Sequence, residues 1–287
     1  MIAYFNGRYL GRDEVMISPD DRGFLFADGL YEVIRSYRGG LFRVAEHLDR
    51  LNYGALQLRL PITDFGYLAE VAGELVRRNQ LSDADALVYL QVTRGAAQRG
   101  HAFPEPQPDL TVYGVVSRFD PTLTWQGRQD GVAVITVPDQ RWARCDLKTV
   151  GLTANVLACQ LAKEAGAVEA VLVRDGVLIE GTHSNFMAVI DDTLVTAPAS
   201  NYILSGITRM TVLELCTDHG IAVDLRPVLF SAAGQATEMM LVGTTAEVTP
   251  IIRMDGRTVG SGRPGPVARL LQGLFEARIS HCGLSPH

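Results

Sequence analysis

Lysine is scarce in this chain, and one of its two lysines stands where it could do chemistry. Lys163 lies beside Glu164 in a segment with helical periodicity, where a solvated helix surface is the simplest interpretation. Lys148 lies between a predicted strand and a predicted helix, with apolar residues around it. A desolvated lysine loses its proton easily and can form a Schiff base. By position alone, an ordinary surface lysine is the simpler interpretation of Lys148.

A carboxylate at the end of a predicted strand is the second candidate. Glu180 is followed by the small and hydrogen-bonding residues Gly181-Thr182-His183-Ser184-Asn185. The ring nitrogen of a pyridoxal cofactor needs an acid beside it, because the protonated ring is the effective electron sink. Glu180 could supply that acid, although taken alone it could also be a glutamate that merely ends a strand.

Three further features could bind a phosphate. Ser205-Gly206-Ile207-Thr208-Arg209 would direct backbone N–H groups outward at a helix start, with a hydroxyl beside them. Gly243-Thr244-Thr245 combines close backbone approach with two hydroxyls. Arg50 lies off the apolar stripe of its helix, which leaves its guanidinium free for a bidentate phosphate contact. Each has an ordinary alternative: Gly and Thr are common in loops and caps, and Arg50 could form a surface salt bridge.

The segment Arg99-Gly100-His101 indicates carboxylate binding. It lies within Arg94 to Asp109, a long loop between two predicted strands. Loops of this length in a compact domain are usually functional or disordered. An arginine with a nearby histidine suits a substrate carboxylate, and Tyr31 could add a phenol donor. A solvent-exposed loop arginine is the alternative.

The elements that must position these residues alternate between strands and helices. In the first part of the chain, we expect strands on both sides of an Asn6-Gly7 turn and a second hairpin of Tyr31–Tyr37 with Leu41–Val44. Two helices should follow, one from Ala45 to Leu58 and one marked by Phe65, Leu68, Ala72 and Leu75. Two further strands are expected at Leu87–Thr93 and Leu110–Ser117. The second part predicts a strand at Val132–Val137, a helix at Thr153–Gly166, two hairpins over residues 170–180 and 186–196, and a helix with a stripe of Met210, Leu213 and Cys216.

This pattern predicts an α/β (α+β) protein with mixed, largely antiparallel sheets and flanking helices. We expect a small N-terminal α/β domain over residues 1–119, a linker over residues 120–128, and a larger cofactor-binding domain over residues 129–287. A length of 287 residues is close to two domains of ordinary size.

The bulk composition excludes several classes of function. Lys plus Arg number 26 and Asp plus Glu 32, so the net charge is 26 − 32 = −6, which gives no basic surface for nucleic acid. We expect no membrane span, since no apolar stretch has the necessary length, and no secretory signal, since the first residues lack its basic region and apolar core. The four cysteines are scattered, without the spacing of a metal site or a disulfide scaffold. We therefore expect a cytoplasmic enzyme that binds neither metal, membrane nor nucleic acid.

Taken together, the motifs resemble those of the class IV aminotransferases, of fold type IV among pyridoxal-phosphate enzymes. The resemblance covers essentially the whole chain in order, through Arg22-Gly23 to Asp28-Gly29, Tyr31-Glu32-Val33, His47-Leu48-Asp49-Arg50-Leu51, Lys148, Glu180-Gly181 to Asn185, Gly206-Ile207-Thr208-Arg209, and Thr244-Thr245 to Pro250. Within the family the chain is most similar to the bacterial D-amino-acid aminotransferases. The deciding segments are Gln91-Val92-Thr93-Arg94-Gly95, Arg99-Gly100-His101-Ala102-Phe103-Pro104-Glu105 and Arg141 to Lys148.

The resemblance assigns a role to each candidate residue. It implies that Lys148 forms the Schiff base with pyridoxal 5′-phosphate and serves as the catalytic base, and that Glu180 contacts the ring nitrogen. It further implies that the cofactor is bound through Arg50, Leu204, Gly206, Ile207, Thr208, Gly243 and Thr244. The substrate would be bound through Tyr31, Val33, Arg99, His101 and Thr245. Arg99 and His101 would reach the active site of the partner subunit in a homodimer and bind the α-carboxylate there.

The expected reaction is a ping-pong transamination between D-amino acids and 2-oxo acids, such as D-alanine with 2-oxoglutarate. The alternatives within the same fold are a branched-chain L-amino-acid aminotransferase, an R-amine transaminase and an aminodeoxychorismate lyase. A pyridoxal-phosphate-binding protein without turnover, or an interaction domain, is the alternative from another class. Three residues depart from the familiar bacterial enzymes: His183 and Gly243, each of which replaces a serine, and Gly100 between the two carboxylate-binding residues.

Overall fold

The computed structural model describes residues 1–281, which divide into two compact units. The first comprises Met1–Asp120 and Leu147–Gly151, together with Ser280 and His281. The second comprises Pro121–Asp146 and Leu152–Ile279. The chain therefore returns briefly to the first unit at Leu147–Gly151, the segment that carries Lys148. The expected domain limits of 1–119 and 129–287 stay a prediction.

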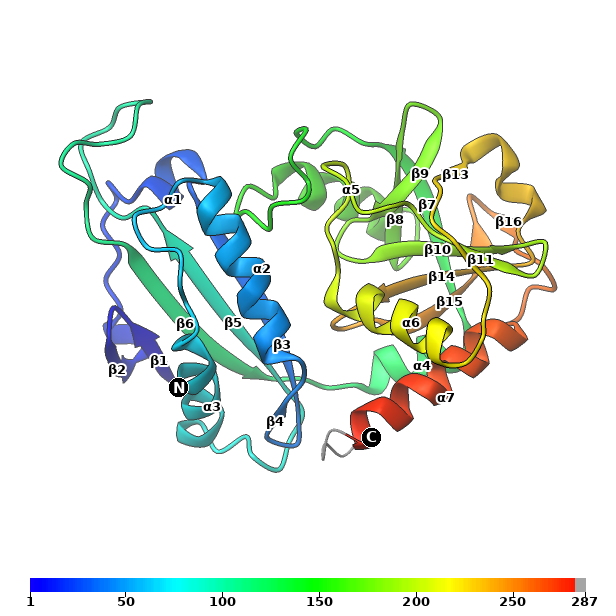
Figure 1. Ribbon diagram of the computed structural model, residues 1–287, viewed down its shortest axis with the longest axis horizontal. Coiled ribbons are helices and arrows are strands. Elements are labelled where there is room, and N and C mark those ends of the chain that lie inside the picture. The colour runs from blue at the N-terminus through cyan, green and yellow to red at the C-terminus, as the bar shows by residue number, and fades with distance from the viewer. Residues whose placement is uncertain (282–287) are drawn as a thin grey trace. The chain divides into compact units, whose positions relative to one another are not determined.

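The first unit is built on an antiparallel sheet in the order β2-β1-β6-β5-β3-β4 (Figure 1). Its strands are β1 (Ile2–Phe5), β2 (Arg8–Gly11), β3 (Gly29–Tyr37), β4 (Gly40–Leu41), β5 (Ala86–Thr93) and β6 (Thr111–Arg118). Its helices are the 3-10 turn η1 (Arg12–Glu14), α1 (Arg22–Phe26), α2 (Val44–Gln57) and α3 (Leu68–Arg78). The expected Asn6-Gly7 hairpin is present as β1 and β2.

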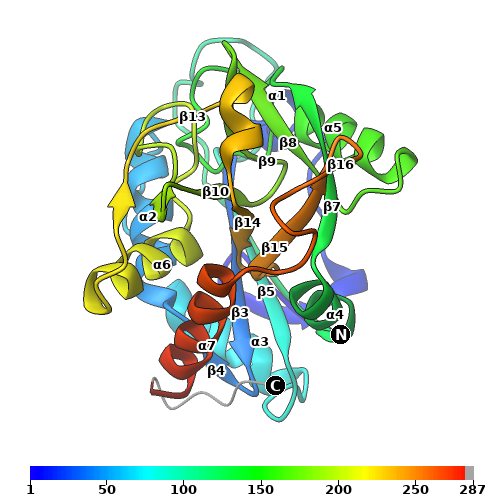
Figure 2. The same ribbon diagram turned by 90° about the vertical axis from the view of Figure 1, so that its right-hand side faces the viewer.

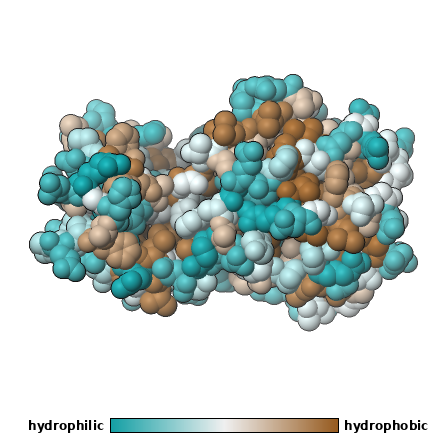
Figure 3. Space-filling model, turned by 90° about the horizontal axis from the view of Figure 1, so that it is seen from above, coloured by the Kyte–Doolittle hydropathy of each residue, from teal (hydrophilic) through white to brown (hydrophobic). Residues whose placement is uncertain are grey.

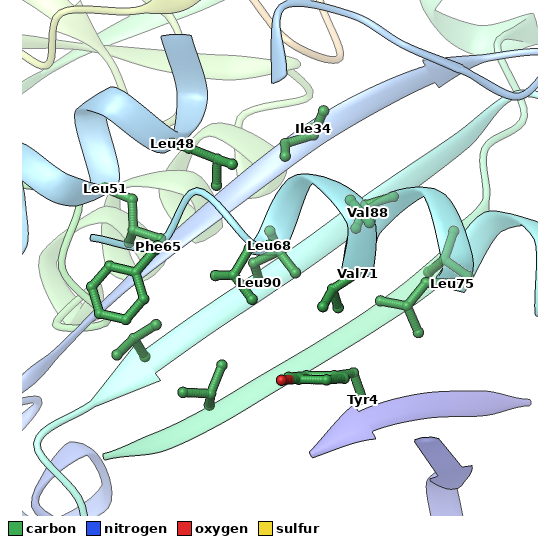
Figure 4. Close-up of a cluster of buried hydrophobic side chains, with 14 of the residues drawn as sticks. Tyr4, Ile34, Leu48, Leu51, Phe65, Leu68, Val71, Leu75, Val88 and Leu90 are labelled. Atoms are coloured by element: carbon green, nitrogen blue, oxygen red, sulfur yellow. The ribbon is translucent and has the colours of Figure 1, made fainter. Parts of the chain in front are cut away.

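The core of the first unit lies between α2, α3 and one face of the sheet (Figure 4). Along β3, side chains alternate between the two faces. Leu30, Glu32 and Ile34 are buried, whereas Tyr31 and Val33 are half-buried. Within the Tyr31-Glu32-Val33 motif, Glu32 therefore lies on the face of the sheet that carries the core, and Tyr31 and Val33 lie on the opposite face.

Two expectations for the first unit are wrong in detail. The return strand expected at Leu41–Val44 is shortened to β4, and α2 already begins at Val44. Arg43 takes a left-handed conformation with φ of 51°, which ends the extended chain and starts the helix. The helix that was expected to include Phe65 begins only at Leu68, although Phe65 is fully buried in the core.

The second unit has a mixed sheet in the order β12-β11-β10-β14-β15-β7-β8-β9-β13, with β16 paired to β15. Figure 2 shows β14, β15 and β7 side by side in this unit. Its strands are β7 (Val132–Pro138), β8 (Glu169–Arg174), β9 (Val177–Gly181), β10 (Asn185–Ile190), β11 (Thr193–Val195), β12 (Val223–Asp224), β13 (Val228–Leu229), β14 (Glu238–Gly243), β15 (Glu247–Met254) and β16 (Arg257–Thr258). Its helices are α4 (Thr122–Asp130), α5 (Thr153–Glu164), α6 (Ile207–Asp218), the 3-10 turn η2 (Phe230–Gln235) and α7 (Pro266–His281).

The second unit also corrects the sequence analysis. Helix α4 begins within the residues expected to form a linker, 120–128, and the linker itself stays a prediction. Of the stripe expected on α6, only Cys216 is buried, while Met210 and Leu213 are half-buried. The strands β14 and β15 were not anticipated. Nearly all their residues are buried, so the alternation of apolar and polar residues that marks a half-exposed strand is missing.

Removing the Phe65 side chain tests how much the first unit depends on its core. Phe65 has no exposed surface and packs among Leu51, Leu68 and Leu90 (Figure 4). We expect Phe65→Ala to lower the free energy of unfolding by about 3–5 kcal/mol, because it removes buried apolar surface and leaves a cavity. Chemical denaturation measures this, with the exposed Leu56→Ala on α2 as control, which should change stability by less than about 0.5 kcal/mol.

Among the described residues, no helix combines the length and the apolar character needed to cross a bilayer.

Candidate active site

The segment that carries Lys148 is attached to the beginning of β3. The Tyr31 N–H donates to the Lys148 carbonyl at 3.0 Å, and the Val150 N–H donates to the Gly29 carbonyl at 3.1 Å. These bonds hold the Lys148 backbone beside Tyr31. The Lys148 Nζ atom lies 3.4 Å from the Tyr31 hydroxyl and 4.4 Å from the centre of its ring. The structure thus brings together two residues that the sequence analysis assigned to catalysis and to substrate binding.

Lys148 has the surroundings of a reactive amine. Its side chain is half-buried, and no carboxylate of the described first unit lies within ion-pair distance of its Nζ atom. No ion pair therefore ties up the Nζ atom within this unit, and the amine is available to attack an aldehyde. Lys163, by contrast, lies exposed on α5.

A buried ion cluster lies on the other face of β3, between that strand and α2. Glu32 has no exposed surface and accepts hydrogen bonds from Arg50 Nε and Nη2, both at 2.7 Å. His47 Nδ1 lies 2.7 Å from Glu32 Oε2. Burial raises the pKa of Glu32, but Arg50 and His47 outweigh it and hold the pKa well below its usual range. Burial lowers the pKa of His47, and Glu32 acts against that change.

This cluster bears on the expectation for Arg50, whose role in binding phosphate stays a prediction. The sequence suggested a guanidinium free to bind phosphate in a bidentate manner, but Glu32 already engages the edge formed by Nε and Nη2. Glu32 therefore fixes the orientation of Arg50, and the sequence analysis missed this role. The sequence does contain a signal for this contact: Glu32 lies on the core face of a strand, and Arg50 lies off the apolar stripe of the helix that follows.

The second unit holds Glu180 at the end of β9, with only 3% of its surface exposed. Its carboxylate accepts hydrogen bonds from Arg141 Nη1, from Asn185 Nδ2 at 2.9 Å and from the Leu204 N–H at 3.1 Å. Burial raises the pKa of Glu180 to about 7, with the Arg141 guanidinium acting in the opposite direction. A carboxyl group with this pKa can hold or release a proton near neutrality, which suits a partner for a pyridine nitrogen.

Arg141 is in turn held by Asp139, which directly follows β7. Asp139 Oδ1 accepts from Arg141 Nε at 2.9 Å, and Asp139 Oδ2 accepts from Nη2 at 3.0 Å. Burial would raise the pKa of Asp139, but its hydrogen bonds and ion pairs with Arg141 and Arg174 lower it. Asp139 is thus a carboxylate that orients Arg141 toward Glu180. Apart from the family resemblance of the segment, nothing in the sequence indicates this pair.

Asn185 connects Glu180 to the first turn of α6. Its Nδ2 atom donates both to Glu180 and to the Leu204 carbonyl, the latter at 2.8 Å. A Cβ atom at Gly206, the N-cap of α6, would lie 2.1 Å from Asn185 Oδ1, so only glycine fits here. The structure therefore places Glu180, Leu204 and Gly206 together, with Ile207 and Thr208 directly after them.

The first turn of α6 has the chemistry of a phosphate site. Its N-cap residue, Gly206, has no side chain that could accept from the backbone N–H groups of this turn. Such a turn attracts anions through these N–H groups and the helix dipole. Gly243 ends β14 close to Ser184, since a Cβ at Gly243 would lie 3.4 Å from that of Ser184. Thr244 and Thr245 follow and are half-buried.

The carboxylate-binding residues Arg99 and His101 lie exposed on the loop between β5 and β6. Within the single chain they form neither a hydrogen bond nor a ring contact with Tyr31 in the described residues. Their surroundings are instead α1 and its neighbours. His183, which replaces a serine, is about half exposed, with Nδ1 3.3 Å from Glu169 Oε1.

The residues present fit pyridoxal 5′-phosphate. A half-buried lysine, a buried carboxyl group with a pKa near neutrality and a helix N-terminus that begins with glycine match its aldehyde, its ring nitrogen and its phosphate. Glu180 and the helix N-terminus are joined through Asn185 in one unit, so their spacing is fixed by the fold.

Comparison with known proteins agrees with this chemistry. Residues 29–254 match the family described as amino-transferase class IV. The chain is 41% identical to a D-alanine aminotransferase of Bacillus licheniformis over 97% of each chain. It is 38% identical to a D-alanine aminotransferase of Staphylococcus aureus, over 96% of this chain and 97% of the relative. A solved T.th. branched-chain amino acid aminotransferase with pyridoxamine 5′-phosphate superimposes with a TM-score of 0.86 at 29% identity, over 96% of this chain and 93% of that one.

The chain belongs to the class IV aminotransferases. It has the fold type IV architecture of that family, and its cofactor is pyridoxal 5′-phosphate.

Proposed function

We propose that this enzyme transfers the amino group of D-amino acids to 2-oxo acids. The observation that carries the choice of D-amino acids is the likeness, over nearly the whole chain, to relatives named D-alanine aminotransferase. The structural neighbours named for branched-chain amino acids are less similar in sequence, at 29% identity for the one described above. These neighbours make branched-chain transamination the second candidate.

The cofactor would be held by residues from both parts of the sequence. Glu180 would lie against its ring nitrogen and Lys148 at its aldehyde. The phosphate and ring would be bound by Arg50, Leu204, Gly206, Ile207, Thr208, Gly243 and Thr244. Bound there, pyridoxal phosphate supplies an electron sink for the negative charge that develops at the substrate α-carbon.

Lys148 is the general base of this proposal. Its Nζ atom removes the α-proton of the amino acid and later returns a proton in the same transfer. The Tyr31 hydroxyl, 3.4 Å away, helps to hold the amine in place and adds a donor for the substrate carboxylate. Glu180 keeps a proton at the ring nitrogen, since burial makes its carboxyl group a good match for that nitrogen.

The substrate would be bound by Tyr31, Val33, Arg99, His101 and Thr245. Because amino acids and 2-oxo acids both carry a carboxylate next to the reacting carbon, one carboxylate site serves both halves of a ping-pong cycle. We propose that Arg99 and His101 serve the site of a partner subunit, which makes the active enzyme a homodimer. Size-exclusion chromatography with light scattering tests this, and a monomer with full activity would contradict it.

Exposed apolar residues support an association of subunits. On the second unit, α5 exposes Val156, Leu157 and Leu161, each at 50% or more. Figure 3 shows hydrophobic residues gathered on one face of this unit. Contiguous exposed apolar surface usually marks an interaction site. We also propose a cytoplasmic location, since Cys145, Cys159 and Cys216 are free thiols.

A panel of amino donors tests the proposed function. The purified holoenzyme is assayed with D- and L-alanine, D- and L-glutamate, L-leucine and R-1-phenylethylamine, each with a 2-oxo acid acceptor. We expect turnover with the D-amino acids. Activity confined to L-leucine or to the amine would overturn the substrate assignment, while an inactive holoenzyme would overturn the transamination itself.

Substitution of Arg99 tests the carboxylate site. We expect Arg99→Ala to raise KM for amino acids and 2-oxo acids by about 10- to 100-fold, because a charge-assisted hydrogen bond contributes roughly 1.5–3 kcal/mol. The absorbance of the bound cofactor should stay unchanged. Steady-state kinetics with both substrates measure the effect, and an unchanged KM would contradict the assignment.

A further inference from the structure

The loop that carries Arg99 and His101 is fixed at its base to α1. The Arg22 N–H donates to the Gly95 carbonyl at 2.9 Å, and the Ala97 N–H donates to the Asp20 carbonyl at 3.2 Å. Gly95 has a φ of 87°, and a Cβ there would lie 1.9 Å from the Asp109 carbonyl oxygen. The two ends of the loop therefore meet at a point where only glycine fits.

A buried arginine holds the tip of the loop. Arg22 has 4% of its surface exposed, and its Nη1 atom donates to the Gly100 carbonyl at 2.7 Å. Its Nε atom donates to Asp28 Oδ2 at 2.9 Å, so the guanidinium cannot rotate freely. Gly100 lies between the two carboxylate-binding residues, and its freedom would otherwise loosen the loop. The bond from Arg22 removes that freedom.

One aromatic ring supports both carboxylate-binding side chains. The Arg99 guanidinium carbon lies 5.1 Å from the centre of the Phe26 ring, and the His101 ring centre lies 5.5 Å from it at an angle of 53°. The Arg22 guanidinium carbon lies 4.8 Å from the same ring. Two cations and an imidazole thus surround Phe26, at distances where the ring attracts positive charge.

The charges in this region leave Arg99 available. Asp28 forms ion pairs with Arg22 and with Arg94. Arg99 is exposed and forms no ion pair with any carboxylate of the described residues. Its contact with Phe26 orients the guanidinium without neutralising it. A guanidinium that is oriented and still charged is prepared for an incoming carboxylate.

We propose that Phe26 and Arg22 are positioning residues that preorganise Arg99 and His101 for binding the substrate carboxylate. This inference rests on the proposed function, because it concerns the same carboxylate site. Phe26 acts through the orientation of both side chains and Arg22 through the backbone of Gly100. Neither needs to touch the substrate.

Phe26→Ala is the variant that tests this role, since removal of Arg22 would leave Asp28 short of a partner and could prevent folding. We expect KM for the D-amino acid and for the 2-oxo acid to rise about five- to tenfold, with kcat within a factor of about two. Phe26→Tyr, which keeps the ring, should restore the wild-type KM. Phe24→Ala is the matched control, because Phe24 lies on the same helix, is 77% exposed and makes no ring contact with the described loop residues.

A double-mutant cycle separates positioning from a general structural effect. In the Arg99→Ala background, Phe26→Ala should add less than about twofold to KM, because its main target is already removed. Full additivity of the two effects would overturn the proposal. Hydrogen exchange of the holoenzyme gives a readout apart from activity: peptides covering residues 96–103 should exchange faster in Phe26→Ala and unchanged in Phe24→Ala.

The failure of this inference differs from the failure of the proposed function. If the enzyme uses L-amino acids instead, the proposed function fails, yet Phe26→Ala should still raise KM for whichever α-carboxylate substrate turns over. If KM and loop exchange are both unchanged in Phe26→Ala, the inference fails while D-amino-acid turnover stands.

Discussion

Replacing Lys148 by alanine is expected to reduce kcat by about four orders of magnitude, the upper range for loss of a positioned general base. Lys148 is the lysine placed beside Tyr31, and the two hydrogen bonds between its segment and β3 fix its backbone there. No other lysine of the described first unit can take over the proton transfer. Pre-steady-state and steady-state transamination rates of the reconstituted variant measure the loss.

The loss should not reflect misfolding, because the Lys148 side chain contributes little to packing. It contacts the hydroxyl and ring of Tyr31, and we expect a stability change below about 0.5 kcal/mol. Lys163→Ala is the matched control, since Lys163 lies exposed on α5 and should leave kcat unchanged. Borohydride treatment of the wild-type holoenzyme should attach the cofactor to the peptide containing Lys148. Attachment to Lys163, or retention of a substantial part of the activity in Lys148→Ala, would contradict the assignment.

The scarcity of lysine is what made Lys148 predictable from the sequence, together with its position between a strand and a helix. Glu180 was predictable as a carboxylate at a strand end, and most hairpins and helices followed from hydrophobic periodicity. These features are local: they depend on residues within a few positions of one another. The strand β14 escaped because it is buried along almost its whole length and carries no alternation.

The partners of the candidate residues could not be predicted in the same way. Glu32 and Arg50 are 18 residues apart, and Asp139 reaches Glu180 only through Arg141. Which carboxylate meets which guanidinium depends on the packing of a helix on a strand or of one strand end against another. Sequence spacing does not contain that information. For the same reason, the contact of Phe26 with Arg99 is visible only in three dimensions.

Replacing Glu180 by glutamine is expected to reduce kcat by about 10²- to 10³-fold, the usual cost of losing one preorganised electrostatic group. Glutamine keeps the shape and can still accept from Asn185 and Leu204, but it can neither carry a charge nor pass a proton to the ring nitrogen. KM should change much less, because Glu180 does not belong to the carboxylate site. A variant with wild-type kcat would contradict the role of Glu180.

Although Glu180→Gln is expected to lower kcat, we expect it to raise the stability of the cofactor-free protein above neutral pH, because the pKa of Glu180 is raised in the folded state. Burial raises the pKa of Glu180 from 4.5 to about 7, so the folded protein without cofactor binds this proton more tightly than the unfolded chain. The stabilisation is therefore fully present below pH 4.5 and is lost as the pH rises through about 7. Glutamine resembles the protonated acid at every pH. At about pH 8 we expect the cofactor-free Glu180→Gln variant to be more stable than the wild type, by about 3 kcal/mol.

Glu32 provides a control of opposite sign. Arg50 and His47 lower its pKa below the ordinary value of 4.5, so its contribution is present above that value and is lost as the pH falls. At about pH 8, Glu32→Gln should thus destabilise the protein, because it leaves the partly buried Arg50 guanidinium against a neutral amide. Denaturation of the cofactor-free proteins between about pH 4 and pH 8 measures both variants. If the stability of the two variants changes with pH in the same direction, the two glutamates do not differ as the structure requires. Opposite changes would agree with a Glu180 that can exchange a proton and a Glu32 that stays an anion and holds Arg50.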